Sequence, residues 1–443
     1  MTITRQIIGG IFGVILFAAA MILGISIDQA SAFKLPDTGQ MLCYDASGNV
    51  ISCAGTGQDG AYTINPMYLH DNGNQMITDY NTGLQWQKCL AGYTNNATCD
   101  FPSGPSATVQ FNWYQASGTY DATHNPSSLN VCAGFGSGWR LPTILELMSI
   151  MDYSLQSPAI QAAYFPNTEY SAWTSFIDIT ETNEAWGVYL NGGIYGSSIT
   201  NINGVRCVRG TQITQSLTDN GNSTVTDNST GLMWQQGEPG PMTRTDALNY
   251  CETLTFPSTN GHTDWRLPNI KELVSLVDYS VANYTDLVPA FNPTFFPSAV
   301  EGVYYWSSTR AIVGANTGEW VVASWDGELA NGASSTSTCN ARCVRSASGG
   351  INVCPASAPV SINGAPYSTI SDAYTAATDG QSIKMQAMYF PEGALTLTRN
   401  ISISLIGGYD CGYVSNLGGF STILGSITIG GTGTVTIENV IIM

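Results

Sequence analysis

The chain has 443 residues, which is enough for about three domains of ordinary size. Its 32 acidic and 14 basic side chains give a formal net charge of -18. This charge repels phosphate backbones and anionic lipid headgroups, so nucleic acid is not an expected partner. Only 10% of the residues are charged and 47 are glycine, a composition suited to a secreted protein with many turns and β-strands.

The N-terminus has the pattern of an export signal. Arg5 precedes an uncharged apolar run from Ile7 to Ile27, and Ala30-Ser31-Ala32 supplies the small residues of a cleavage site. We therefore expect residues 1–32 to be a signal peptide and the mature protein to be secreted or held at the outer cell surface. The apolar run also approaches the roughly 20 residues that span a bilayer, so the alternative is an uncleaved membrane anchor.

After a loop-rich lead-in at residues 33–64, four motifs occur twice in the same order and define repeats at 65–210 and 215–348. The motifs are Asp-Asn-Gly-Asn (71–74 and 219–222), Thr-Gly-Leu-x-Trp-Gln (82–87 and 230–235), Trp-Arg-Leu-Pro (139–142 and 265–268) and Arg-Cys-Val-Arg (206–209 and 342–345). Because Asn-Gly is a strong hairpin signal and alternating residues follow it, we expect a β-hairpin to open each repeat.

A short amphipathic helix is expected directly after each Trp-Arg-Leu-Pro motif. Thr143 and Asn269 are candidate N-cap residues, and Glu146 and Glu272 follow three positions later, which is the pattern of a capping box. Apolar residues then recur at the spacing i, i+3, i+4 and i+7, as on the buried face of a helix. We expect both glutamates to be structural rather than catalytic.

Tryptophans and arginines also recur at matched positions. The tryptophan pairs are Trp86 and Trp234, Trp139 and Trp265, Trp173 and Trp306, and Trp186 and Trp320. A position shared by both repeats favours core packing over sugar stacking. Trp113 and Trp325 have no counterpart, so these two residues, with Asp326, are the candidate ligand-binding residues. The repeated arginines, which include Arg140 and Arg266, are expected to form buried pairs with carboxylates.

The opening turn of each repeat offers oxygen ligands for calcium. The candidate metal ligands are Asp71 and Asp79 in the first repeat and Asp219 and Asp227 in the second. The alternative is that Asn-Gly only makes the hairpin, while Asp79 or Asp227 caps the next turn by accepting from backbone amides. The spacing lacks the dense acidic pattern of an EF-hand loop, which favours the turn interpretation, and no cofactor is expected.

All 11 cysteines lie beyond the export signal, so disulfides are the default expectation. Pairing cysteines within the proposed units gives Cys43 with Cys53, Cys89 with Cys99, Cys132 with Cys207, Cys251 with Cys343, and Cys354 with Cys411. The two longest pairs would tie an early element of each repeat to its final strand. Cys339 is left over, either as a free thiol or as an intermolecular link.

Residues 351–443 have a different texture, rich in Thr, Ser, Gly and Ile. Short predicted strands separated by Gly-rich corners fit the rungs of a right-handed parallel β-helix. Only about two or three rungs fit in this length, so we expect an incomplete β-helix.

The four repeated motifs resemble the Lcl C-terminal domain family, which is named for the C-terminal domain of a bacterial collagen-like adhesin. The resemblance covers roughly residues 65–348 in two copies. It implies the α+β class, with two C-type-lectin-like domains in tandem, and a glycan-binding role. Trp-Arg-Leu-Pro before a glutamate-bearing helix is also similar to the formylglycine-generating enzymes, and the tail is similar to the start of a pectin-lyase-like β-helix.

Three functional classes follow from these observations. The first is a secreted or surface-associated binding and adhesion protein that recognises glycan or extracellular matrix, which rests on analogy of fold. The second is a structural spacer or assembly unit without a small ligand. The third is an enzyme of the formylglycine-generating or polysaccharide-lyase type, but the sequence shows no nucleophile with a neighbouring base. We expect a non-enzymatic binding protein whose partner is a glycan or a cell-surface component.

Overall fold

The structure is a computed structural model that describes residues 33–443 except 46, 54, 63, 103–108, 169, 179–182, 259–260, 281–288, 301, 314–315, 334–335, 348–358, 387–388, 410–412, 414–420 and 443. The expected signal peptide and the expected Cys354–Cys411 pair lie outside the described residues. Strands make up 34% and helices 11% of the described residues, so the fold is mostly β and has less helix than the expected α+β class. Within the described ranges, no helix has the length and apolar character needed to cross a membrane.

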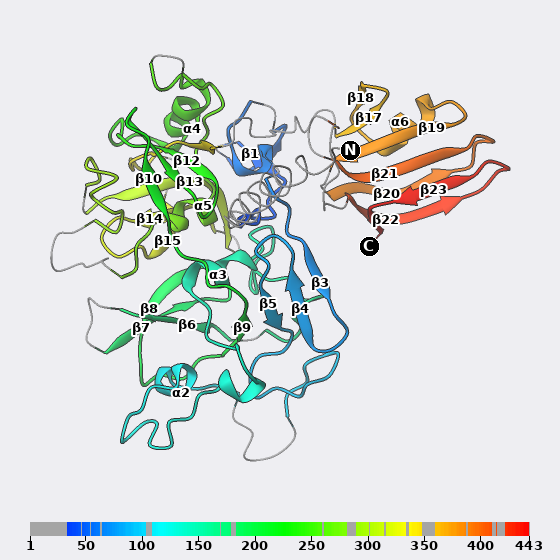
Figure 1. Ribbon diagram of the computed structural model, residues 1–443. Coiled ribbons are helices and arrows are strands. Elements are labelled where there is room, and N and C mark those ends of the chain that lie inside the picture. The colour runs from blue at the N-terminus through cyan, green and yellow to red at the C-terminus, as the bar shows by residue number, and fades with distance from the viewer. Residues whose placement is uncertain are drawn as a thin grey trace, which may run out of the picture. The chain divides into compact units, whose positions relative to one another are not determined.

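The first repeat contains two antiparallel sheets within its described residues (Figure 1). The four-stranded sheet consists of β3 (Leu69–Asp71), β4 (Met76–Asp79), β5 (Gln85–Gln87) and β9 (Val208–Arg209), in that order. The three-stranded sheet consists of β6 (Ala172–Ile177), β7 (Glu184–Val188) and β8 (Ile194–Ser198). The last strand pairs with the third, opposing Val208 to Trp86, so the two ends of the repeat meet in one sheet.

The second repeat has the same topology. Its four-stranded sheet consists of β10 (Leu217–Asp219), β11 (Thr224–Asp227), β12 (Leu232–Gln235) and β16 (Val344–Ser346). Its three-stranded sheet consists of β13 (Tyr304–Val313), β14 (Asn316–Ala323) and β15 (Leu329–Ala333). Strands β3–β4 and β10–β11 are antiparallel pairs that enclose the two Asn-Gly turns, which confirms the expected hairpins.

The helices of the repeats are short. They are α2 (Trp113–Ser117), α3 (Ile144–Ser149), α4 (Arg244–Thr253) and α5 (Ile270–Ser275). Thr143 and Asn269 are the N-caps of α3 and α5, and each accepts from the backbone N–H of the glutamate three positions later. Glu146 and Glu272 accept from the N-cap backbone in return, so both capping boxes are confirmed.

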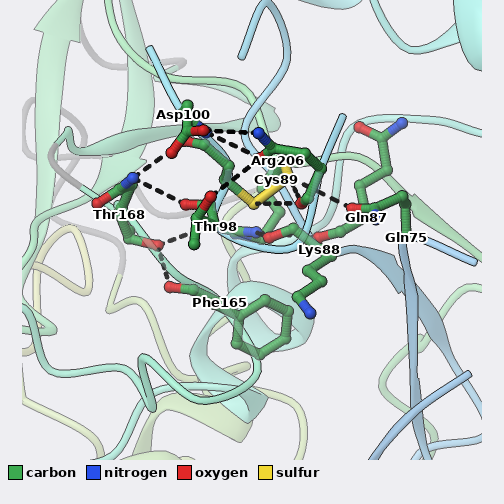
Figure 2. The surroundings of a disulfide bond; sticks show 12 residues. Gln75, Gln87, Lys88, Cys89, Thr98, Asp100, Phe165, Thr168 and Arg206 are labelled. Carbon is green, nitrogen blue, oxygen red and sulfur yellow. Dashed lines mark hydrogen bonds between the residues drawn. A yellow bond between two sulfur atoms is a disulfide. The ribbon is translucent and has the colours of Figure 1, made fainter. Parts of the chain in front are cut away.

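The described residues contain four disulfides, and all four are among the expected pairs. Cys132–Cys207 and Cys251–Cys343 tie an early element of each repeat to the residue before its last strand, with Cα–Cα distances of 5.5 Å in both. The other two are Cys43–Cys53, which closes the hairpin of β1 (Cys43–Tyr44) and β2 (Val50–Ile51), and Cys89–Cys99 (Figure 2). Cys339 is a buried free cysteine.

The two repeats share one continuous hydrophobic core. Tyr153 of the first repeat packs edge-on against Trp320 of the second, with ring centroids 5.7 Å apart. Tyr279 of the second repeat packs in the same way against Trp186 of the first, at 5.6 Å. Because each contact repeats the other with the roles exchanged, the interface has the reciprocal pattern of a two-fold symmetric dimer within one chain.

The lead-in segment lies buried against both repeats. The Gln40 side chain donates to the carbonyl oxygens of Tyr153 in the first repeat and Arg310 in the second. The Lys271 ammonium of α5 donates to the carbonyl oxygens of Asp37 and of Ser149 at the end of α3, at 2.8 and 3.1 Å. The lead-in is loop-rich, as expected, and its polar groups connect the two repeats.

A buried carboxylate in the lead-in makes stability sensitive to pH. Asp59 is 2% exposed and accepts hydrogen bonds from the hydroxyls of Thr38 and Thr309. Burial raises the pKa of Asp59 from 3.8 to about 6. Between these two values the folded protein holds a proton that the unfolded chain has released. The contribution of Asp59 to stability is therefore present at low pH and is lost as the pH rises through about 6.

We expect Asp59→Asn to remove this pH dependence. The quantity to compare is the free energy of unfolding of the variant minus that of the wild type. This difference should be about 1–3 kcal/mol larger at pH about 7.5 than at pH about 4.5. Urea unfolding at both pH values measures the difference. Asp45→Asn is the matched control in the same segment, because Asn49 holds the pKa of the exposed Asp45 below its usual value. Equal pH dependence in wild type and Asp59→Asn would contradict the account.

The C-terminal segment forms two sheets and a core of its own. Its elements are β17 (Val360–Ile362), β18 (Ala365–Tyr367), α6 (Ile370–Ala376), β19 (Gln381–Gln386), β20 (Tyr389–Leu397), β21 (Ile403–Tyr409), β22 (Ser421–Ile429), β23 (Val435–Glu438) and β24 (Val440–Ile442). Strands β19, β21 and β23 pair in parallel, and so do β20, β22 and β24. From β19 on, the chain therefore alternates between a five-stranded sheet, in which β17 pairs antiparallel with β18 and β19, and a parallel three-stranded sheet.

Candidate functional site

The aspartates of the opening turns are engaged in the turns themselves. Asp79 is 1% exposed and accepts from the backbone N–H of Asn81 and the hydroxyl of Thr82, at 2.9 and 2.7 Å. Asp227 repeats both hydrogen bonds with Ser229 and Thr230. These contacts confirm the turn-capping interpretation, in which the carboxylate replaces a backbone acceptor.

The two aspartates at the start of the hairpins also have local partners. Asp71 accepts from the backbone N–H of Gly73 and forms an ion pair with Lys88 at 2.7 Å. Asp219 accepts from the backbone N–H of Gly221. In the described part of the chain, no group of three or more His, Cys, Asp or Glu side chains is placed to hold a metal ion.

Trp113 lies in the core of the first repeat, so the expectation of an exposed aromatic there is wrong. Its side chain is 6% exposed, and its indole N–H donates to the carbonyl oxygen of Thr174 at 3.0 Å. Trp113 is the first residue of α2, whose N-cap Asn112 forms a capping box with Gln115. The helix start therefore directs the ring inward, which removes Trp113 from the candidate ligand-binding residues.

Trp325 and Asp326 lie in the turn between β14 and β15. The half-buried Trp325 ring packs edge-on against Tyr304, which is 38% exposed, with centroids 4.9 Å apart. Asp326 accepts from the backbone N–H of Glu328, and burial raises the pKa of its carboxyl group. The structure thus brings an accessible aromatic pair and a carboxylate together at this turn.

The first repeat has a second accessible aromatic pair, which the sequence analysis missed. Tyr189, 48% exposed, stacks on Tyr195 with ring centroids 3.7 Å apart, next to the turn between β7 and β8. Tyr195 lies opposite Gly187 in the sheet, where any added Cβ would come within 3.0 Å of the ring. Glycine at that position leaves room for the stack. In the sequence the only signal is a pair of tyrosines, and the aromatic residues predicted to bind ligand were tryptophans.

The expected pairing of repeated arginines with carboxylates is confirmed for Arg140, Arg266, Arg342 and Arg345, whereas Arg206 and Arg209 form no ion pair with the described residues. Arg140 binds Glu146 through two hydrogen bonds of 2.7 Å, and Arg266 binds Glu272 in the same bidentate manner. Both glutamates are buried, but the Arg140 side chain is 27% exposed and that of Arg266 only 2%. The Tyr62 ring of the lead-in lies near the Arg266 guanidinium, which accounts for part of this difference.

Comparison with known families identifies the repeated unit. The two repeats match the Lcl C-terminal domain family at residues 75–209 and 223–345, which together are more than half of the chain. The chain therefore belongs to the Lcl C-terminal domain family and carries two tandem copies of the domain. No curated protein matches the chain.

Proposed function

We propose that this protein is a secreted or surface-attached binding protein that recognises glycan or extracellular matrix material without catalysing a reaction. The observation that carries the proposal is the Trp325–Tyr304 pair, an accessible aromatic surface beside the Asp326 carboxylate. Aromatic faces bind the apolar faces of sugars, while a carboxylate accepts hydrogen bonds from sugar hydroxyls. Membership of a family named for an adhesin domain supports the same class of function.

Two further features support the proposal. The four disulfides suit an oxidising extracellular space. The buried thiol of Cys339 has its pKa raised to about 11, so it stays protonated at neutral pH and is unsuited to act as a nucleophile. We also propose that each repeat is a C-type-lectin-like domain and that the parallel strands of the C-terminal segment, which alternate between two sheets, are coils of a β-helix.

Glycan-array binding by the full chain tests the proposal. The wild type should bind, and Trp325→Ala should weaken binding by about tenfold or more, equivalent to about 1.4 kcal/mol. Tyr80→Ala is the control, because Tyr80 is an exposed aromatic, at 53%, outside the proposed surface. Unchanged binding by Trp325→Ala would contradict the assignment of the surface.

The second candidate function is a structural spacer or assembly unit. It is favoured by the lead-in contacts through Gln40 and Lys271, which use buried polar groups to hold both repeats in one unit. An array on which the folded wild type binds no glycan or matrix component would favour this second candidate.

A further inference from the structure

The tyrosine pair of the first repeat presents one open ring face to solvent. Tyr189 stacks on Tyr195 with ring centroids 3.7 Å apart and ring planes inclined by 19°. Tyr189 is 48% exposed and Tyr195 only 8%, so Tyr195 covers one face of the Tyr189 ring and the other face is accessible. The Tyr195 hydroxyl lies within hydrogen-bonding reach of the side chains of Ser171 and Asn203. The inner ring is therefore held in place, and the outer ring is a preorganised flat surface.

This pair lies where the second repeat has its own aromatic pair. Counted from the matched tryptophans of β6 and β13, Tyr304 corresponds to Ser171. Tyr304 opposes Ala323 across the sheet, and Ala323 corresponds to Tyr189 when counted from the matched tryptophans of β7 and β14. The register between the two strands is the same in both repeats. At one cross-strand position, each repeat therefore has a tyrosine, but the two tyrosines come from opposite strands.

Packing of the shared fold does not require these tyrosines. In the second repeat, Ala323 and Ala330 stand where the first repeat has Tyr189 and Tyr195, so the same three-stranded sheet forms without either ring. Both repeats have an accessible aromatic pair at this end of the sheet, although different residues supply it. A surface feature that is present twice while its residues differ indicates binding rather than core packing.

Another exposed tyrosine pair does not pass the same comparison. Tyr80, which is 53% exposed, packs on Tyr68 with ring centroids 4.6 Å apart. The backbone hydrogen bond from Tyr80 to Tyr68 recurs in the second repeat between Asn228 and Ser216, so these polar residues occupy the matching positions. An aromatic pair is therefore not common to both repeats at this place, and Tyr80 serves as a control.

A polar side chain adjoins the aromatic surface in each repeat. A Cβ added at Gly193 would lie 3.7 Å from the Tyr189 ring and 3.3 Å from Asn191 Oδ1, so the Asn191 amide lies beside that ring. In the second repeat, the Asp326 carboxylate is a hydrogen-bond partner of the Trp325 side chain. Amides and carboxylates both form hydrogen bonds with sugar hydroxyls. The net charge of -18 disfavours a sulfated glycan, so a neutral pyranose suits both surfaces best.

We propose that Tyr189, backed by Tyr195, is a second glycan-binding platform and that the chain binds a neutral glycan at two points, one in each repeat. This inference rests on the function proposed above for the Trp325 turn. A pyranose ring stacks on the open face of Tyr189, and Asn191 forms hydrogen bonds with its hydroxyls. Because the repeats share one core, the two platforms keep a fixed separation, and a glycan that reaches both binds more tightly than a short one.

Calorimetric titration of the full chain with chitotriose, a short neutral oligosaccharide, tests the second platform. The wild type should bind two molecules per chain, Trp325→Ala and Tyr189→Ala one each, and the double variant none. Tyr189→Phe keeps the ring face and should still bind two. On immobilised chitin, where both platforms can bind one polymer, each single alanine variant should bind at least about tenfold more weakly than the wild type.

The control variant is Tyr80→Ala, which should bind two molecules of chitotriose per chain. Alanine at position 189 is compatible with the fold, because Ala323 occupies the matching position of the second repeat, and an unchanged melting temperature checks this. One molecule per wild-type chain, lost in Trp325→Ala and retained in Tyr189→Ala, would overturn the second platform and leave the proposed function intact. Absence of chitotriose binding by the folded wild type would also overturn this inference, while the glycan array decides separately on the proposed function.

Discussion

Replacing Glu272 by alanine is expected to lower the free energy of unfolding by about 3–5 kcal/mol, because it leaves a buried arginine without its counter-charge. The Arg266 side chain is 2% exposed and gives two hydrogen bonds to the Glu272 carboxylate. The same carboxylate accepts from the backbone N–H of Asn269, so the substitution also removes half of the capping box of α5.

Glu146→Ala is the matched control for this prediction. It removes the same two contacts in the first repeat, together with a hydrogen bond that Glu146 accepts from the backbone N–H of Ile213. The Arg140 side chain, however, is 27% exposed, and its charge can be hydrated by water once the glutamate is gone. We therefore expect a smaller loss, of about 1–2 kcal/mol. Urea unfolding of the two variants measures both values. Equal losses would mean that burial of the arginine does not determine the cost.

The second large effect is expected at the contact between the repeats. Trp320 is 2% exposed and packs against Tyr153, whose hydroxyl donates to the carbonyl oxygen of Gly192. Trp320→Ala should cost about 3–5 kcal/mol through the cavity that it leaves. Two double-mutant cycles combine Trp320→Ala with Tyr153→Phe and with Tyr153→Ala. The Tyr153 ring should account for a coupling energy of about 0.5–1.5 kcal/mol with Trp320.

The reciprocal contact supplies the control for that cycle. Trp186 and Tyr279 make the same edge-on contact with the repeats exchanged, so their coupling energy should have the same sign and a similar size. Strictly additive effects at both contacts, in unfolding free energies measured with urea, would show that the rings are buried without stabilising the interface.

Local chemistry made much of the fold predictable from the sequence. The capping boxes of α3 and α5 depend on residues three positions apart, and the Cys132–Cys207 and Cys251–Cys343 disulfides follow from cysteines placed alike in two copies. The Arg140–Glu146 and Arg266–Glu272 pairs follow from arginines repeated in apolar surroundings. Duplication helped because a pattern that occurs twice points to shared structure.

The features that were not predicted from the sequence depend on the three-dimensional environment of a side chain. Trp113 has no counterpart in the second repeat, yet it is core, because a helix begins at that residue and directs it inward. The packing of Tyr153 on Trp320 joins residues of different repeats, and no local spacing encodes that distance.

The central claim is that the two repeats and the lead-in form one cooperative unit, and native-state hydrogen exchange of the full chain tests it most directly. Amide protection is measured in β4 of the first repeat and β11 of the second, for the wild type and Trp320→Ala, at increasing urea concentrations. The account predicts that Trp320→Ala lowers the opening free energy of both strands by the same amount. A loss confined to β11, with β4 unchanged, would contradict it.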